Sequence, residues 1–159
     1  MKTFDPRELR NVLGQFATGV TVITTTDPAG NKVGLTANSY NSVSLDPPLI
    51  LWSLARNSRS MNVFSTCEAF VVHILAAHQE DLARRFASRD VDKFAGLKTR
   101  EGLGGAPVFD DCLAHLECRT EKRIEGGDHI IFLGRVMNFQ AGDHDPLIFH
   151  SGRFTRFGT

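Results

Sequence analysis

The chain has 159 residues, 42% of them hydrophobic and 23% charged, and this predicts a single domain over residues 1–159 with a core large enough to fold unaided. Lys plus Arg number 18 and Asp plus Glu number 18, a balance that argues against a nucleic-acid partner bound through its phosphates. No apolar run approaches the ~18 residues of a membrane helix, so we expect no membrane association.

The N-terminal stretch predicts a helix over residues 5–17. Asp5 is a good N-cap, and Pro6 suits the first helical position because that position needs no hydrogen-bonded N–H. Apolar residues then recur at helical spacing and predict one apolar face. These residues are Leu9, Val12, Leu13 and Phe16.

The next elements are predicted to be strands with two short helices between them. β-branched residues around a turn at 27–31 predict a hairpin over 20–36. Pro47 and Pro48 forbid ladder pairing before a buried strand over 49–54. The elements that follow are a short helix begun by Ser58, a strand over 69–75 and an amphipathic helix over 78–87.

The second half of the chain predicts a surface excursion over 88–111, which contains five Gly or Pro residues. Two strands, 113–124 and 129–140, then flank an EGGD hairpin loop, and 146–154 predicts a final strand. In the strand 113–124, apolar residues alternate with polar ones, so one face is expected to be wet. The residues expected on that wet face are Glu117, Arg119 and Glu121. Many short strands with few helices indicate an antiparallel barrel or sandwich.

Several common functional motifs are absent from the sequence. The histidines form no HxxxH or HExxH pair and no cysteine has zinc-finger spacing, so no metal site is predicted. The P-loop, the GxSxG elbow and the GxGxxG fingerprint are also missing. Three cysteines without a CxxC pair predict a reduced, cytoplasmic protein.

Four stretches have both a structural and a chemical interpretation. Segment 36–44 is either a hydroxyl-rich strand edge or a cradle for a polar heteroaromatic ring such as a flavin. Stretch 53–60 is either an ordinary helix cap or a phosphate site. The side chains that would contact that phosphate are Ser58, Ser60 and either Arg56 or Arg59. Lys93 is either a phosphate ligand or part of a charged loop. His129 follows a glycine turn, so it is either a structural histidine or a site residue at a rim.

Taken in order, these motifs resemble the flavin reductase family, the reductase components of two-component flavin-dependent monooxygenases. The stretches that carry the resemblance are FATGVTVITT, GLTANSYNSVSLDPPLILWSL, SRSMNVF, DLARRFA, DKF, LECRTEKRIEGGDHIIFLGRV and PLIFHSGRF. The resemblance implies a mainly β fold with flanking helices, an antiparallel Greek-key split β-barrel. It also implies a homodimer with flavin bound near the subunit interface, and a separate monooxygenase as partner.

The resemblance also implies the site. FMN or FAD would be the bound flavin, and NAD(P)H the co-substrate. The flavin-binding residues would be Thr36, Ala37, Asn38, Ser39, Ser53, Leu54, Ala55, Ser58, Ser60, Phe86, Lys93 and Phe94. The residues near the nicotinamide would be Asp128, His129 and Phe154, with His129 as the catalytic position. Phe154 stands where the family commonly has Tyr, so a hydroxyl contact is missing there.

Three alternatives stay open at this point. The first is a flavin-binding or storage protein with no enzymatic activity on the same barrel. The second is a flavin-dependent reductase of another acceptor, such as a corrinoid. The third is a relative of pyridoxamine-phosphate oxidase, which shares the barrel and lacks the G-D-H segment at residues 127–129.

Overall fold

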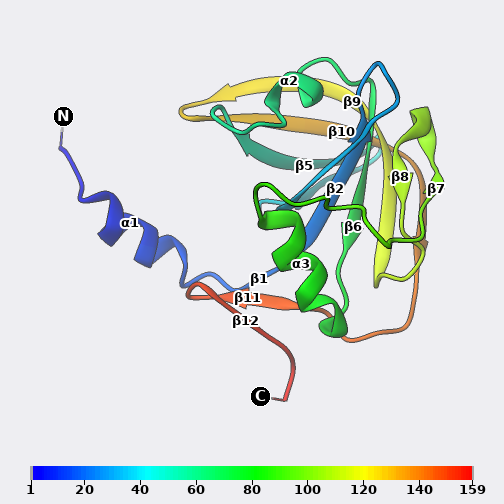
Figure 1. Cartoon of the computed structure of the whole chain (residues 1–159). Coiled ribbons are helices and arrows are strands. Elements are labelled where there is room, and N and C mark those ends of the chain that lie inside the picture. The colour runs from blue at the N-terminus through cyan, green and yellow to red at the C-terminus, as the bar shows by residue number, and fades with distance from the viewer. Residues whose placement is uncertain (1, 159) are drawn as a thin grey trace.

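The computed structural model describes residues 2–158 (Figure 1). Its helices are α1 (Pro6–Leu13), α2 (Met61–Phe64) and α3 (Glu80–Ala87), with the 3-10 turns η1 (Ala77–Gln79) and η2 (Leu103–Gly105). Its strands are β1 (Thr18–Gly19), β2 (Thr21–Thr26), β3 (Lys32–Ala37), β4 (Asn41–Leu45), β5 (Pro48–Ala55), β6 (Ala69–Ile74), β7 (Arg100–Glu101), β8 (Pro107–Val108), β9 (Ala114–Gly126), β10 (His129–Ala141), β11 (Ile148–His150) and β12 (Arg153–Thr155).

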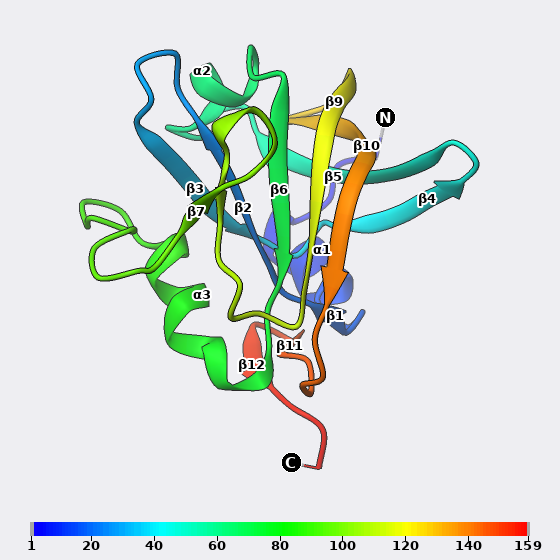
Figure 2. The same cartoon turned by 90° about the vertical axis from the view of Figure 1, so that its right-hand side faces the viewer.

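The main sheet has seven strands in the order β3-β2-β6-β9-β10-β5-β4, and every neighbouring pair is antiparallel. Figures 1 and 2 show that this sheet is strongly curved. Its curvature brings Ser39, just after β3, to within hydrogen-bond distance of Ser53 on β5. The predicted mainly β antiparallel fold with flanking helices is therefore confirmed, and the split in the barrel lies between β3 and β5.

The core inside the curved sheet is built around aromatic side chains. Trp52 on β5 stacks on Phe132 of β10 with ring centroids 4.6 Å apart, and Phe64 of α2 meets Trp52 edge-on at 5.0 Å. Aromatic pairs of this kind are worth about 0.5–1.5 kcal/mol each beyond the area they bury. These contacts fix α2 against β5, and so they fix the loop between β5 and α2.

Helix α3 packs on the β2–β3 hairpin through Ala83 and Phe86, which are fully buried on one face of this helix, as expected for the amphipathic helix predicted over 78–87. The Thr36 hydroxyl of β3 donates to the Ala83 carbonyl at 2.6 Å. Gly34 permits the close approach, because an added Cβ there would lie 2.7 Å from the Phe86 ring and 3.2 Å from Phe94. The absence of a side chain at Gly34 thus lets α3 lie close to the sheet.

The predicted surface excursion is wrong in part. Residues 98–113 return over the sheet as β7, η2 and β8, and Ala106 and Val108 are buried against Val71. Glu117, expected on a wet face, is 5% exposed. Its carboxylate accepts from the Leu103 N–H of the returning segment at 2.8 Å and from the Asn138 amide of β10 at 2.7 Å. Glu117 is buried by residues that are distant in the sequence, so the alternation of polar and apolar residues within its own strand does not reveal this burial.

Three element boundaries also differ from the prediction. The expected strand 146–154 is the hairpin β11–β12, whose turn at Ser151 and Gly152 has positive φ at both residues. The short helix begins at Met61, because residues 58–60 form a turn in which Ser58 O accepts from the Met61 N–H. Strand β4 was not predicted, and it pairs with β5 although its residues are mostly exposed. The expectation that both prolines forbid ladder pairing is wrong at Pro48, which begins β5 opposite Leu45. Proline lacks only the N–H, so it is tolerated as the first residue of a strand.

Helix α1 forms as expected, with Asp5 accepting from the Arg7 N–H at 2.8 Å, and it ends at Leu13. None of its residues is buried. Its apolar face is exposed, with Val12 at 69% and Leu13 at 66%, and the helix stands away from the sheet (Figure 1). Within residues 2–158, no helix is long and apolar enough to cross a membrane.

Candidate functional site

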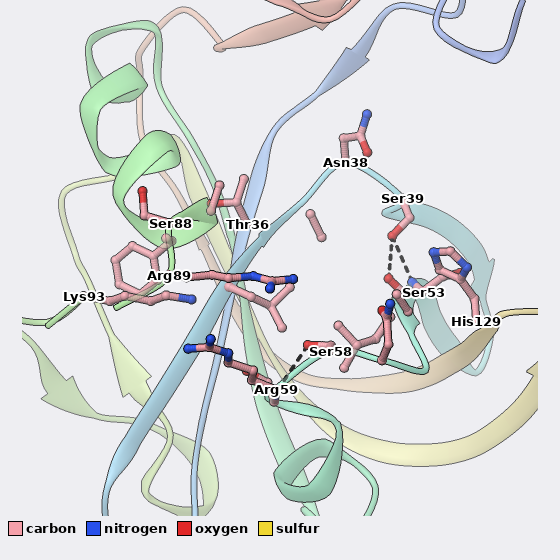
Figure 3. A pocket seen from close by; sticks show the side chains of 18 of the residues that line it. Thr36, Asn38, Ser39, Ser53, Ser58, Arg59, Ser88, Arg89, Lys93 and His129 are labelled. Carbon is pink, nitrogen blue, oxygen red and sulfur yellow. Dashed lines mark hydrogen bonds between the residues drawn. The ribbon is translucent and has the colours of Figure 1, made fainter. Parts of the chain in front are cut away.

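A cleft of about 530 Å³ lies where the barrel is split. Strands β3 and β5, the loop after β5, the end of α3 and the start of β10 form its walls (Figure 3). The lining residues are Leu35, Thr36, Ala37, Asn38, Ser39, Ser53, Leu54, Ala55, Asn57, Ser58, Arg59, Ser60, Phe86, Ala87, Ser88, Arg89, Asp90, Lys93 and His129. Short side chains dominate along the two strands, so a flat ring can approach the backbone closely.

One end of the cleft is neutral and rigidly bonded. The Ser39 hydroxyl accepts from the Ser53 N–H at 2.9 Å and donates to the Ser53 carbonyl at 3.1 Å, which joins the ends of β3 and β5. Thr36 is likewise engaged, with the carbonyl of Ala83. These hydroxyls therefore shape the cleft. Asn38 has no side-chain hydrogen bond within the described part of the chain, so its amide is free for a ligand.

The opposite end of the cleft is cationic. Arg59, Arg89 and Lys93 converge there (Figure 3). Among the lining residues of the cleft, Asp90 carries the one carboxylate. The Arg59 guanidinium donates to Asp90 at 2.9 Å and lowers the pKa of that carboxyl. Lys93 Nζ donates to the Gly34 carbonyl at 3.0 Å, and burial lowers the pKa of its ammonium. A charge excess of this kind suits a phosphate.

His129 stands at the neutral end, as the first residue of β10 and opposite Ala55 of β5. Its Nδ1 donates to the Asp128 carboxylate at 2.7 Å, and this contact lowers the pKa of Asp128. Arg56 holds the turn in place, since its N–H donates to the Asp128 carbonyl and its Nε donates to the Gly127 carbonyl. The ring is thus oriented by one carboxylate, and Nε2 is left for another partner.

The family described as flavin reductase like domain matches residues 13–158 of the chain. The chain belongs to this family. The resemblance noted from its motifs is therefore confirmed.

Two curated relatives and one solved structure illustrate the similarity. A protein described as "Probable flavin reductase" from Rhizobium meliloti is 46% identical over 96% of this chain, which spans about half (49%) of its length. The FMN reductase (NADH) SmoA from Agrobacterium fabrum is 45% identical, over 95% of this chain and 86% of its own. The nitrilotriacetate monooxygenase component B homologue from Mycobacterium thermoresistibile superposes with a TM-score of 0.90 at 40% identity, covering 95% of this chain and 86% of its own.

Most of the residues that the family resemblance implies do gather at the cleft. The implied residues that line it are Thr36, Ala37, Asn38, Ser39, Ser53, Leu54, Ala55, Ser58, Ser60, Phe86, Lys93 and His129. Phe94 lies behind Phe86, edge-on at 5.0 Å. Asp128 reaches the site through His129. Phe154 packs on Phe149 beneath the Arg84 guanidinium, away from the cleft of the single chain. The binding roles of all these residues stay predictions.

The structure adds cleft residues that the sequence prediction did not include. They are Leu35, Asn57, Arg59, Ala87, Ser88, Arg89 and Asp90. Arg59 had been an alternative to Arg56, and the structure places Arg59 in the cleft and Arg56 under the G-D-H turn. The signal for Arg89 and Asp90 was their position in the same charged stretch as Lys93.

Proposed function

We propose that this chain is an NAD(P)H-dependent flavin reductase that supplies reduced FMN or FAD to a separate monooxygenase. The observation that carries the proposal is the polarity of the cleft, which joins a narrow neutral slot to a cationic end. A flavin has the same polarity, with a flat ring at one end and a phosphate at the other. Two relatives support the proposal. SmoA is named as an FMN reductase that uses NADH, and the solved relative is named as a homologue of a monooxygenase component.

The donor set of the cleft fits a flavin. Lys93 and Arg59 would bind its phosphate, and the Ser39–Ser53 pair would hold the walls of the slot at a fixed separation. When bound, the flavin supplies the ring atom that accepts a hydride from reduced nicotinamide. The protein then needs no general base for this transfer, and its task is to align two rings.

His129 would position the nicotinamide at the open side of the slot. Its ring is fixed by Asp128, whose backbone is in turn fixed by Arg56. A preset ring reduces the entropy that is lost when the co-substrate is aligned. Asp128 is therefore a positioning residue, while His129 is the residue that would touch the co-substrate.

The decisive experiment measures NADH and NADPH oxidation by the purified chain with added FMN, FAD or riboflavin. We expect flavin-dependent oxidation that produces free reduced flavin. Flavin binding without NAD(P)H oxidation would favour the non-enzymatic flavin protein. Oxidation that proceeds only with a corrinoid or another added acceptor would favour the second alternative.

Lys93→Ala tests the assigned direction of the flavin in the cleft. Loss of a charge-assisted hydrogen bond worth roughly 1.5–3 kcal/mol should weaken FMN binding by about 10–100-fold. Riboflavin, which has no phosphate, should bind almost as before. Fluorescence quenching gives both Kd values, and Lys122→Ala on the exposed part of β9 is the matched control. Equal losses for FMN and riboflavin would mean that Lys93 does not meet the phosphate.

The functional unit that we propose is a cytoplasmic homodimer of this one domain, with the flavin near the subunit interface. The apolar face of α1 supports a dimer, because the helix buries none of its residues within one chain. A second copy that covers Val12, Leu13 and Phe16 would remove that exposed apolar surface from water. Light scattering should report a dimer, and Leu13→Glu should shift it towards monomer. A wild-type monomer with full activity would overturn this proposal.

A further inference from the structure

Asp90 places a negative charge at the end of the cleft where an anion is proposed to bind. It follows α3, and its Oδ1 accepts from Arg59 Nη1 at 2.9 Å, so it reaches the loop after β5. The pair therefore joins two walls of the cleft beside the proposed phosphate position. Binding of a phosphate does not explain a carboxylate there, so Asp90 needs an explanation of its own.

The three cations at this end of the cleft differ in their partners. Lys93 Nζ donates to the Gly34 carbonyl, which carries no full charge. Within residues 2–158 the Arg89 side chain makes no hydrogen bond, although its charge helps to lower the pKa of Asp90. Only Arg59 of these three is ion-paired within that range. Asp90 therefore acts on one particular phosphate donor, and not on the cationic end as a whole.

The backbone and the charge of Asp90 both suit a fixed contact with Arg59. Its φ is 60°, in the left-handed region that Asp and Asn adopt more readily than most other residues. The hydrogen bond from Arg59 lowers the pKa of the carboxyl, so Asp90 stays ionised near neutral pH. A permanent negative charge thus lies against the guanidinium.

A phosphate and a carboxylate compete for the same guanidinium donors, because both anions match its planar fork. Asp90 uses Nη1 of Arg59, so a phosphate that binds through this nitrogen has to displace the carboxylate. The two side chains are 66% and 80% exposed, and ion pairs as exposed as this one are weak. A flavin phosphate can therefore break the pair, at a cost to its own affinity.

We propose that Asp90 is an internal competitor of the flavin phosphate for Arg59, which weakens flavin binding and speeds flavin release. This proposal rests on the proposed function and adds a residue that sets the rate of flavin exchange. A reductase that supplies reduced flavin to a second enzyme has to release its product. A carboxylate that takes Arg59 back as the phosphate leaves favours that release. Asp90 is a positioning residue, because it acts on the flavin through Arg59.

The test is Asp90→Asn, which removes the charge and keeps a residue type that tolerates the positive φ. The Kd of FMN should fall by about two- to fivefold, the range expected from an exposed charge pair. The dissociation rate constant of FMN in stopped flow should fall by a similar factor. The Kd of riboflavin, which has no phosphate, should stay the same. A merely structural role of Asp90 would change the binding of both flavins alike.

Two further variants make the test specific. Asp92→Asn is the matched control, because it removes the same charge two residues away, outside the lining of the cleft. Asp92 accepts from the Phe94 N–H at 3.2 Å, a contact that the amide oxygen of Asn can also make. This control should leave the Kd of FMN unchanged. In an Arg59→Gln background, Asp90→Asn should lose most of its effect, because the guanidinium for which the anions compete is gone.

Unchanged FMN affinity and release in Asp90→Asn would overturn the proposal, as would equal changes for FMN and riboflavin. Weaker FMN binding would also overturn it, since Asp90 would then hold Arg59 in place for the phosphate. A full effect in the Arg59→Gln background would show that Asp90 does not act through Arg59. The expected shifts in a protein that oxidises no NAD(P)H with any flavin would keep this proposal and overturn the proposed function. Flavin-dependent oxidation without these shifts would do the reverse.

Discussion

Two histidines on the same sheet have opposite surroundings. His73 on β6 is fully buried, stacks on Phe109 at 4.0 Å and has both ring nitrogens bonded. Its Nδ1 donates to the Val22 carbonyl at 3.0 Å, and its Nε2 accepts from the Phe109 N–H at 3.1 Å. His129 on β10 has a side chain that is 46% exposed, and within residues 2–158 its ring has a single hydrogen-bond partner, Asp128.

The difference shows how packing either uses both ring nitrogens of a histidine or leaves one of them available. At His73 the protein uses both nitrogens, and burial lowers the pKa of the imidazole to about 3, so the ring stays neutral. No capacity is left for a ligand. At His129 the protein uses one nitrogen to orient the ring and leaves the other. The number of ring nitrogens that the protein leaves without a hydrogen bond therefore distinguishes these two histidines better than their positions in the sequence do.

The largest expected effect is on stability, at His73. His73→Ala leaves the Phe109 N–H buried without its partner, at about 1–3 kcal/mol, removes the ring's hydrogen bond to the Val22 carbonyl, and opens a cavity. We expect a loss of roughly 3–5 kcal/mol in the free energy of unfolding, measured in urea. His129→Ala should cost under about 1 kcal/mol. Similar losses for both variants would contradict the distinction between them.

The second prediction concerns the stability of the wild-type protein in acid. A histidine that titrates near 6.5 when unfolded and at about 3 when folded binds more protons in the unfolded state between those values. The free energy of unfolding should therefore fall as pH falls from about 6.5, by up to ~1.4 kcal/mol per pH unit. Burial lowers the pKa of His115 as well, which acts in the same direction.

Urea titrations between pH 6.5 and pH 5.5 report mainly on these histidines, because carboxylates with ordinary pKa values near ~4 stay almost fully ionised there. His73→Ala should flatten the slope in this window if enough of it folds to be measured. Stability that does not change across the window in wild-type protein would mean that His73 is accessible to protons in the folded state.

The third prediction is kinetic and concerns His129. His129→Ala should raise the KM for NADH and slow hydride transfer by up to about 10²-fold, because a ~1 Å misplacement of reacting groups has effects of that size. Flavin Kd and melting temperature should change little. Single-turnover reduction in stopped flow gives the rate constant. A lower melting temperature with an unchanged reduction rate would make His129 a structural residue like His73.

The smallest effect is expected at Asp128. Asp128→Asn replaces a charged acceptor of the His129 N–H with a neutral one, a change worth about 0.5–1.5 kcal/mol and hence a ~2–10-fold slower hydride transfer. Glu125→Gln is the matched control, since Glu125 belongs to the same hairpin and contacts Arg56 at 3.5 Å instead of the histidine. Equal effects of the two substitutions would show that only the charge of the turn matters.

Local signals in the sequence predicted much of this fold. The hairpin at 20–36 and the turn before His129 were predicted because glycine and aspartate turns specify their own geometry. The return of residues 98–113 was missed because its burial depends on Val71, far away in sequence. Strand β4 was missed because it is exposed along most of its length, and its alternating apolar residues, Val43 and Leu45, pack into no core.

The residues of the cleft were predicted from the family motifs more than from the chemistry of their side chains. Thr36 and Ser39 were expected to face a ligand with their hydroxyls, and the structure shows both bonded to backbone. Arg89 and Asp90 were missed because no local pattern indicates that the end of α3 meets the loop after β5. Whether a polar side chain is free or already partnered depends on packing, which a sequence pattern does not report.

The width of the cleft depends on the absent side chain of one glycine. Phe86 lines the cleft with Phe94 edge-on against it, and a Cβ on Gly34 would lie 2.7 Å from the Phe86 ring and 3.2 Å from the Phe94 ring. An alanine there would push Phe86 outward and shift Phe94 slightly with it, so it would change the width of the cleft in one step. Directed evolution towards bulkier or synthetic flavins would therefore begin at this strand position, and would adjust the two phenylalanines as a pair.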